Sequence, residues 1–157
     1  MSNISIRLYR SSDAKQIAQL FYETVHTVNA KDYSREQLDA WAPKELDTAG
    51  WERALFPTIA FVAQIGKKIV GFADFLPDGF LCHLYVHKDH QRQGIATLLL
   101  AEVEKTAKAQ GLASMQTEAS ITARPFFESQ GYMAGPAQQK RHNNQIFINY
   151  PMRKRLN

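Results

Sequence analysis

Three short apolar runs in the middle of the chain, separated by tight turns, constrain its fold more than any other feature. The runs are Ile59 to Ile65, Ile69 to Leu76 and Phe80 to Val86, with Gly66-Lys67 and Pro77-Asp78-Gly79 between them. Apolar runs of this length are typical of strands, and turns this short join neighbouring strands in antiparallel order. The pattern predicts an antiparallel meander.

The segment before the meander predicts one strand and two helices. Ile4, Ile6 and Leu8 alternate with polar residues, as in a half-exposed strand. One helix is predicted from apolar residues at helical spacing between Ile17 and Val28, and Ser12 or Asp13 can cap its start. A second helix is predicted from the capping box Ser34-Arg-Glu-Gln37, with Tyr33 and Leu38 as a hydrophobic staple and an end at Trp41-Ala42, before Pro43. Another helical turn is expected around Trp51 to Leu55.

The segment after the meander predicts two helices and three strands. A long helix fits 94–110, a strand 115–118 and a short helix 123–130, with Gly111 and Gly131 closing the two helices. The last two strands are predicted at 132–137 and 145–152, joined by a polar turn over 138–144. The order β-α-α-β-β-β-α-β-α-β-β predicts a single α/β domain over 1–157, with a mixed, mostly antiparallel sheet flanked by helices.

Composition and charge narrow the class of protein. The 157 residues include one cysteine, so no internal disulfide can form and a reducing cytoplasm is the expected compartment. We find no signal peptide and no apolar stretch that would span a membrane, so no membrane association is expected. The net charge of +4 includes Arg153, Lys154 and Arg155 at the C-terminal end. A basic end is typical of a solvated terminus, so nucleic acid is not the predicted partner and stays an alternative.

The segment Leu84 to Thr97 contains the clearest functional signal. A strand ends there, a polar turn follows, and Gly94 and Ala96 lie at the start of the long helix. Small residues let a ligand approach backbone N–H groups that have no partner within the helix, and the helix dipole favours negative charge. The turn is neither a Walker loop nor a Rossmann fingerprint, because it lacks their lysine and their glycines. It predicts a pyrophosphate site, and its alternative is a ligand-free strand-to-helix turn.

Two motifs resemble those of one enzyme family. Gln91-x-x-Gly94-x-Ala96, preceded by Leu84-Tyr85-Val86, is similar to the acetyl-CoA signature of the GNAT N-acetyltransferases. Ala119-Ser120-x-x-Ala123-x-x-Phe126-Phe127-Glu128-x-x-Gly131-Tyr132 resembles a downstream segment of that family. Both motifs occur in register with the predicted elements, so the resemblance spans nearly the whole chain.

The resemblance implies a set of residues that bind acetyl-CoA, the acetyl donor. The strand-end backbone at Leu84, Tyr85 and Val86 would bind the pantetheine arm, and one N–H there would stabilise the thioester carbonyl. The turn and helix start would cradle the pyrophosphate with Gln91, Arg92, Gln93, Gly94, Ile95, Ala96 and Thr97. Ser120, Phe126 and Phe127 would line the thiol end.

The sequence departs from the family pattern at the residue that would donate a proton to the thiolate. The motifs also do not identify the base. Many relatives carry a tyrosine at the position of Phe127 to protonate the leaving thiolate, and phenylalanine cannot do so. Water or another hydroxyl would replace it; Tyr132 and Tyr150 are candidates, although packing on a strand with a solvated hydroxyl is the favoured role of both. His83 is the candidate base, and its alternative is a structural histidine. Asp78 and Glu118 are carboxylates that solvent or the protein would satisfy.

The acceptor region is predicted in the first two helices. His26, Tyr33 and Trp41 would form an aromatic wall that binds an amine by cation–π contact, or Tyr33 and Trp41 would only staple and fill the core. No metal is predicted, because His83, His87 and His90 diverge from a strand into a turn. Cys82 is predicted to be a small residue of the hydrophobic core.

The predicted function is N-acetylation of a primary amine on a small molecule or peptide, by direct attack in a ternary complex. A non-catalytic acyl-CoA-binding sensor or interaction module is the main alternative, and Phe127 favours it. A homodimer is left open.

Overall fold

The predicted meander forms the centre of the sheet in the computed structural model, which describes residues 3–157. Its strands are β2 (Ile59–Ile65), β3 (Lys68–Phe75) and β4 (Phe80–Val86), and β1 (Ile4–Leu8) pairs antiparallel with β2. The other strands are β5 (Ser114–Ser120), β6 (Met133–Ala134), β7 (Gln138–His142) and β8 (Gln145–Arg155). The order is β1-β2-β3-β4-β5-β8-β6, with β7 beside β8. Strands β4 and β5 pair in parallel, and the remaining neighbours pair antiparallel.

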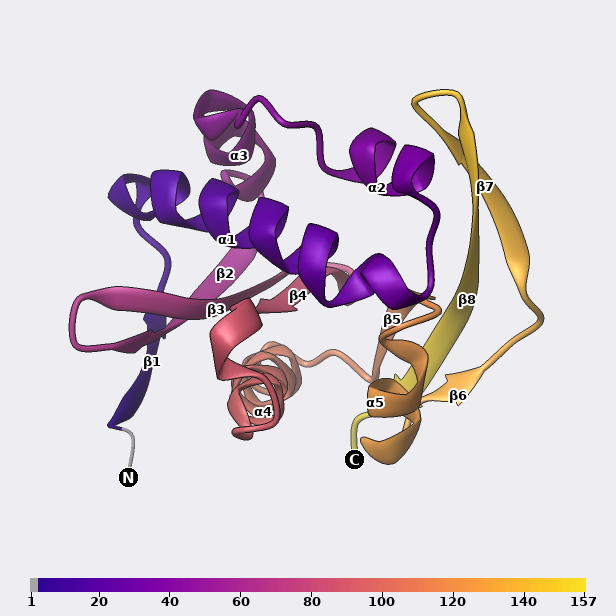
Figure 1. Ribbon diagram of the computed structural model, residues 1–157. Coiled ribbons are helices and arrows are strands. Elements are labelled where there is room, and N and C mark those ends of the chain that lie inside the picture. Colours follow the sequence, from indigo (N-terminus) through magenta and orange to yellow (C-terminus); the bar gives the residue numbers. More distant parts are fainter. Residues whose placement is uncertain (1–2) are drawn as a thin grey trace.

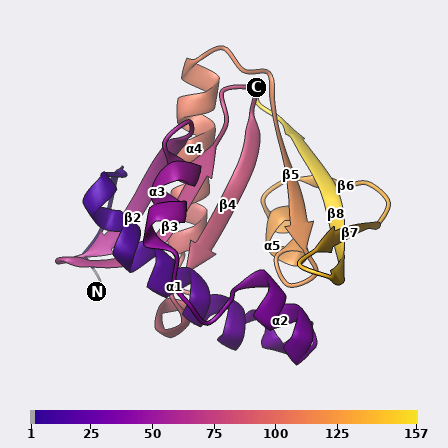
Figure 2. The same ribbon diagram turned by 90° about the horizontal axis from the view of Figure 1, so that it is seen from above.

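Helices cover both faces of the sheet (Figures 1 and 2). The helices α1 (Ala14–Thr27), α2 (Arg35–Trp41) and α3 (Thr48–Leu55) lie on one side, and α4 (Ile95–Ala109) and α5 (Arg124–Ser129) lie on the other. Successive side chains of β2 point to opposite faces of the sheet, and both faces are apolar. Phe61 and Ala63 belong to the core under α4, whereas Ala60 and Val62 belong to the core under α1 and α3. The predicted α/β arrangement is therefore confirmed. Within residues 3–157, no helix is long and apolar enough to cross a lipid bilayer.

The start of α1 differs from the prediction. Neither Ser12 nor Asp13 caps this helix, because residues Ser11–Asp13 form a separate 3₁₀ turn before it. The Asp13 carboxylate accepts two hydrogen bonds of 2.8 Å from the Arg7 guanidinium and one of 2.8 Å from the Arg10 N–H. Both oxygens of the carboxylate are thus engaged with Arg7 and Arg10, so Asp13 links β1 to the turn and does not cap α1.

The start of α2 matches its sequence signature. The Ser34 hydroxyl accepts from the Gln37 N–H at 3.1 Å, and the Gln37 side chain accepts from the Ser34 N–H at 2.9 Å. Tyr33 and Leu38 are buried in one cluster, as a hydrophobic staple requires. Helix α3 begins earlier than expected, because the Asp47 carboxylate caps it by accepting from the Gly50 N–H at 2.8 Å.

The C-terminal region is where the sequence interpretation was wrong. The predicted polar turn over 138–144 contains strand β7, which pairs with β8 around the two-residue turn Asn143-Asn144. Both asparagines have positive φ (46° and 66°), as tight hairpin turns require. Strand β7 carries polar side chains because it is a largely exposed edge, so it has no apolar alternation to detect. The strand predicted at 132–137 shortens to β6, because Pro136 has no N–H to donate to the ladder.

Candidate active site

A cleft opens where the two parallel strands separate. Strands β4 and β5 pair only at Phe80 with Gln116 and at Leu81 with Thr117, and they diverge beyond that point (Figure 2). The Thr117 hydroxyl donates to the Leu81 carbonyl at 2.9 Å and closes the narrow end. A cavity of about 610 Å³ occupies the cleft. Its walls include the predicted donor-binding residues Leu84, Tyr85, Val86, Gln91, Arg92, Gly94, Ile95, Ala96, Thr97, Ser120, Phe126 and Phe127, but not Gln93.

The turn before α4 has the backbone geometry of an anion site. Gly94 precedes the helix with φ of 81°, and Arg92 in the same turn also has positive φ (60°). A Cβ on Gly94 would meet no atom within 4 Å, so the space above this backbone is open to the cavity. The first N–H groups of this 15-residue helix have no partner in the helix and attract negative charge. The residues present therefore fit a pyrophosphate.

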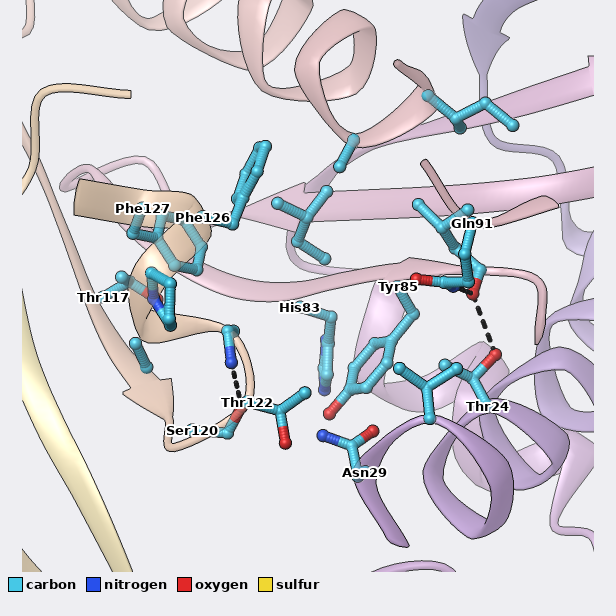
Figure 3. Close-up of a pocket in the computed structure, with 18 of the residues that line it drawn as sticks. Thr24, Asn29, His83, Tyr85, Gln91, Thr117, Ser120, Thr122, Phe126 and Phe127 are labelled. Carbon is cyan, nitrogen blue, oxygen red and sulfur yellow. Dashed lines mark hydrogen bonds between the residues drawn. The ribbon is translucent and has the colours of Figure 1, made fainter. Parts of the chain in front are cut away.

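The Gln91 side chain lines the cavity and forms hydrogen bonds within the protein (Figure 3). Its amide nitrogen donates to the Val86 carbonyl at 2.7 Å and to the His87 carbonyl at 3.3 Å. The Thr24 hydroxyl on α1 donates to the same Val86 carbonyl at 3.0 Å. Because a carbonyl has two acceptor positions, the protein already occupies both on Val86. Gln91 thus fixes the end of β4 against the turn and against α1.

A second cavity, of about 650 Å³, adjoins the first. Its lining is dominated by the aromatic residues Phe21, Tyr33, Trp41, Trp51, Phe80, Tyr85 and Phe147. Both cavities are lined by His83, Tyr85 and Trp41, so they meet at these side chains. Tyr33 and Trp41 pack edge to face at 5.1 Å, and the Tyr33 hydroxyl accepts from the Ile121 N–H at 2.9 Å. The predicted aromatic wall therefore includes Tyr33 and Trp41, which also pack in the core.

The structure does not bring His26 to this wall. Its Nε2 donates to the Ala42 carbonyl at 2.7 Å, and its ring lies on Tyr22 with centroids 4.4 Å apart. His26 lines neither cavity. This hydrogen bond joins α1 to the end of α2, so the role of His26 in the structure is to hold the two helices together.

His83 lies at the junction of the two cavities (Figure 3). Its Nδ1 is 2.7 Å from Oδ1 of Asp74, a fully buried residue on β3. Among residues 3–157, Nε2 of His83 has no hydrogen-bond partner, and the side chain is 28% exposed. Asp74 was missed by the sequence interpretation. The available signal was an acidic residue within the apolar run Ile69-Val-Gly-Phe-Ala-Asp-Phe75, which a buried strand does not accept without a partner.

Cys82 also lines both cavities but is a poor nucleophile there. Burial, together with the negative charges of Asp74 and Asp78, raises the pKa of the Cys82 thiol to about 12. The thiolate is the nucleophilic form of cysteine, and at neutral pH this residue stays a thiol. The site therefore offers no cysteine for an acyl-enzyme.

The two tyrosines expected to supply a hydroxyl group do not line the cavities, whereas Tyr85 does. The Tyr132 hydroxyl donates to Glu104 at 2.8 Å, and the Tyr150 ring stacks under Arg124 at 4.4 Å; neither tyrosine lines a cavity. Tyr85 lines both, and burial raises the pKa of its phenol, partly offset by a hydrogen bond with Trp41. Tyr85 therefore keeps its proton at neutral pH.

The remaining candidate groups have partners in the protein. Asp78 accepts from the Phe80 N–H at 3.0 Å in its turn. Glu118 lines both cavities, but one of its oxygens lies 3.2 Å from Lys140 and accepts from Gln138 at 2.9 Å. Over residues 3–157, no three His, Cys, Asp or Glu side chains gather in a way that could hold a metal ion.

Comparison with known proteins supplies independent findings. A family model described as an acetyltransferase (GNAT) domain matches residues 29–156. The chain is 31% identical over 153 residues to "Uncharacterized N-acetyltransferase YafP" of Escherichia coli (strain K12), covering 98% of this chain and 97% of that protein. A GCN5-related N-acetyltransferase from Rhodopseudomonas palustris, also named as a class-II aminotransferase, has 33% identity and a TM-score of 0.93, covering 99% and 98% of the two chains. PaiA N-acetyltransferase from Thermoplasma acidophilum, solved with coenzyme A, shares the fold at 17% identity and a TM-score of 0.82, covering 98% and 99%.

Proposed function

This chain belongs to the GNAT family of acetyltransferases, and on that premise we propose that it acetylates a primary amine by direct attack within a ternary complex. Residues 1–157 act as one acetyltransferase domain. The observation that carries the proposal is the meeting of two cavities at His83, one with an anion-binding turn and the other with aromatic walls. A single free thiol suits a reducing compartment, so the cytoplasm is the proposed location.

Acetyl-CoA is the acetyl donor, and it supplies the acetyl group as an activated thioester. The N–H groups at the start of α4 and the charge of Arg92 would bind its phosphates, since both face the first cavity. Ser120, Phe126 and Phe127 would enclose the thiol end. Phe127 is buried against Tyr132, with centroids 5.3 Å apart, so it packs there and transfers no proton.

His83 would take the proton that the amine must lose. A primary amine has a pKa of about 10, so it arrives mainly as ammonium. Nε2 of His83, which has no hydrogen-bond partner among residues 3–157, would take this proton directly or through one water where the donor cavity and the aromatic cavity meet. Because Cys82 stays protonated, the amine would attack the thioester without an acyl-enzyme. Tyr85 is the phenol at this junction that would donate a hydrogen bond to the departing thiolate, which then takes its proton from solvent.

The second cavity favours an amine attached to an aromatic or apolar body. Its rings come from α1, α2, α3, β4 and β8, so they surround the space from several sides. Ring faces attract an ammonium group, and the same rings bury an apolar substituent. This chemistry fits either a small arylalkylamine or a peptide end with an apolar first residue.

The test is release of free thiol from acetyl-CoA with a panel of arylalkylamines, straight-chain diamines and short peptides. We expect turnover with the arylalkylamines or apolar peptides to exceed that with the diamines. His83→Ala should lower kcat/KM by about 10²-fold, because no imidazole then takes the proton from the amine. Calorimetric binding of coenzyme A should be unchanged in this variant.

Two results would contradict the proposal. A His83→Ala enzyme with wild-type turnover would leave His83 as a structural residue. Tight coenzyme A binding without thiol release for every amine class would favour the acyl-CoA-binding sensor. A nucleic-acid role receives less support, because Lys154 in the basic C-terminal segment is paired with Glu104 at 2.8 Å.

A further inference from the structure

Asp74 is a buried carboxylate that the fold does not need for its own packing. It lies in β3 between Ala73 and Phe75, both fully buried in the apolar core, and it is itself fully buried. Its Oδ2 atom has no hydrogen-bond partner among residues 3–157. Burying a carboxylate with half of its acceptors unused is costly, so an apolar residue here would serve stability better. Such a group is expected where chemistry requires it.

The sheet register explains why Asp74 meets His83. The two residues are direct cross-strand partners on β3 and β4, so their side chains project from the same face of the sheet. The register then shifts, because Phe75 is opposite Leu81 and Cys82 is the extra residue on β4. This bulge occurs beside the cavity junction, and bulges commonly redirect a side chain near an active site.

The surrounding rings fix the orientation of the imidazole. Trp51 on α3 lies 4.9 Å from the His83 ring, and Phe72 on β3 lies 6.2 Å from it. Tyr85 lies 6.4 Å away on the same strand. The titratable groups at the imidazole are therefore Asp74 on β3 with Cys82 and Tyr85 on β4, and α3 contributes only an uncharged ring. Among residues 3–157, Asp74 is the charged group that forms a hydrogen bond with His83, whereas Glu118 of β5 lines both cavities but is paired with Lys140.

We propose that Asp74 is a positioning residue that holds His83 with its proton on Nδ1, so that the lone pair of Nε2 faces the acceptor amine. An ionised carboxylate can only accept hydrogen bonds, so the contact of 2.7 Å requires a hydrogen on Nδ1. When Nε2 takes a proton from the amine, the resulting imidazolium lies against the negative charge of Asp74 and is stabilised by it. The proton later leaves Nε2 for solvent. The inference rests on the proposed role of His83 as the base.

The tautomer of the His83 imidazole can be measured by NMR on the wild-type protein. Selective ¹⁵N labelling of histidine and two-dimensional NMR at about pH 8.5, where an ordinary imidazole is neutral, distinguish protonated from unprotonated ring nitrogens. We expect His83 to show Nδ1–H with an unprotonated Nε2. A wild-type spectrum with the proton on Nε2 would overturn the inference, whatever the activity.

The matching variant is Asp74→Asn, with Asp13→Asn as its control. The side-chain amide that this substitution introduces can donate to Nδ1, so we expect a population of the Nε2–H tautomer and a loss of about 10²-fold or more in kcat/KM, with coenzyme A binding retained. Asp13 is another buried carboxylate, 4% exposed, but it lines neither cavity. Asp13→Asn should lower stability without changing the His83 tautomer or kcat/KM.

A double-mutant cycle separates this inference from the proposed function. If Asp74 acts through His83, Asp74→Asn should cause no further loss of kcat/KM in a His83→Ala background. A full additional loss there would show that Asp74 supports the structure of the site only, and would overturn the inference. If the tautomer changes as expected but His83→Ala is fully active, the contact is correct and the proposed role of His83 as base is wrong.

Discussion

The turn before α4 gives the sharpest test of donor binding. Valine at Gly94 would have to adopt φ of 81°, a left-handed conformation that costs a branched residue about 1–3 kcal/mol. Its side chain would extend into the open space above the turn, where a Cβ meets no protein atom within 4 Å. That position would displace a phosphate from the backbone N–H groups. Losing two charge-assisted hydrogen bonds, each about 1.5–3 kcal/mol, weakens binding by about 10²- to 10⁴-fold.

Gly111 provides a matched control at the other end of the same helix. It has φ of 85°, and a Cβ there also meets no atom within 4 Å, but Gly111 lines neither cavity. Both Gly94→Val and Gly111→Val should therefore lower Tm, by about 2–4 °C per kcal/mol of strain. Only Gly94→Val should weaken coenzyme A binding in isothermal titration calorimetry. Equal affinities in the two folded variants would refute the assignment of the phosphate site.

Three further predictions follow from single residues of the structure. Phe127→Leu should raise the KM for acetyl-CoA while leaving the pH profile of kcat unchanged, and a large fall in kcat at constant KM would contradict a packing role. Cys82→Ala should keep the steady-state mechanism and most of the activity, whereas ping-pong kinetics in the wild type would argue for an acyl-enzyme. Burial alone would raise the pKa of Asp13, but hydrogen bonds from Arg7 and the Arg10 N–H hold that pKa below its usual value. The stabilisation is thus present above about pH 4 and lost as pH falls through the lowered pKa. Asp13→Asn should cost about 2–3 kcal/mol at pH 7 in urea unfolding, and the difference from wild type should narrow in acid; a constant difference would refute this linkage.

Local patterns in the sequence determined most of the element order and the donor turn. Short-range chemistry sets the meander turns, the capping box at Ser34 and the glycine at the start of α4, so each could be recognised from a few neighbouring residues. The same holds for the two motifs that resemble the acetyltransferase family. Strand β7 escaped this reasoning because an exposed edge strand needs no apolar alternation, although Asn143-Asn144 was a usable hairpin signal.

Tertiary structure decided the contact between Asp74 and the proposed base, His83, and the shape of the proposed acceptor cavity. Asp74 and His83 meet only because β3 and β4 pair in one register and a bulge follows at Cys82. A shift of one residue would move the carboxylate to the other face of the sheet. The aromatic walls likewise combine rings from α1, α2, α3, β4 and β8, which no local pattern connects. Hydrogen bonds within a turn depend on a few adjacent residues, whereas a side-chain contact across strands depends on how the whole sheet and its helices pack.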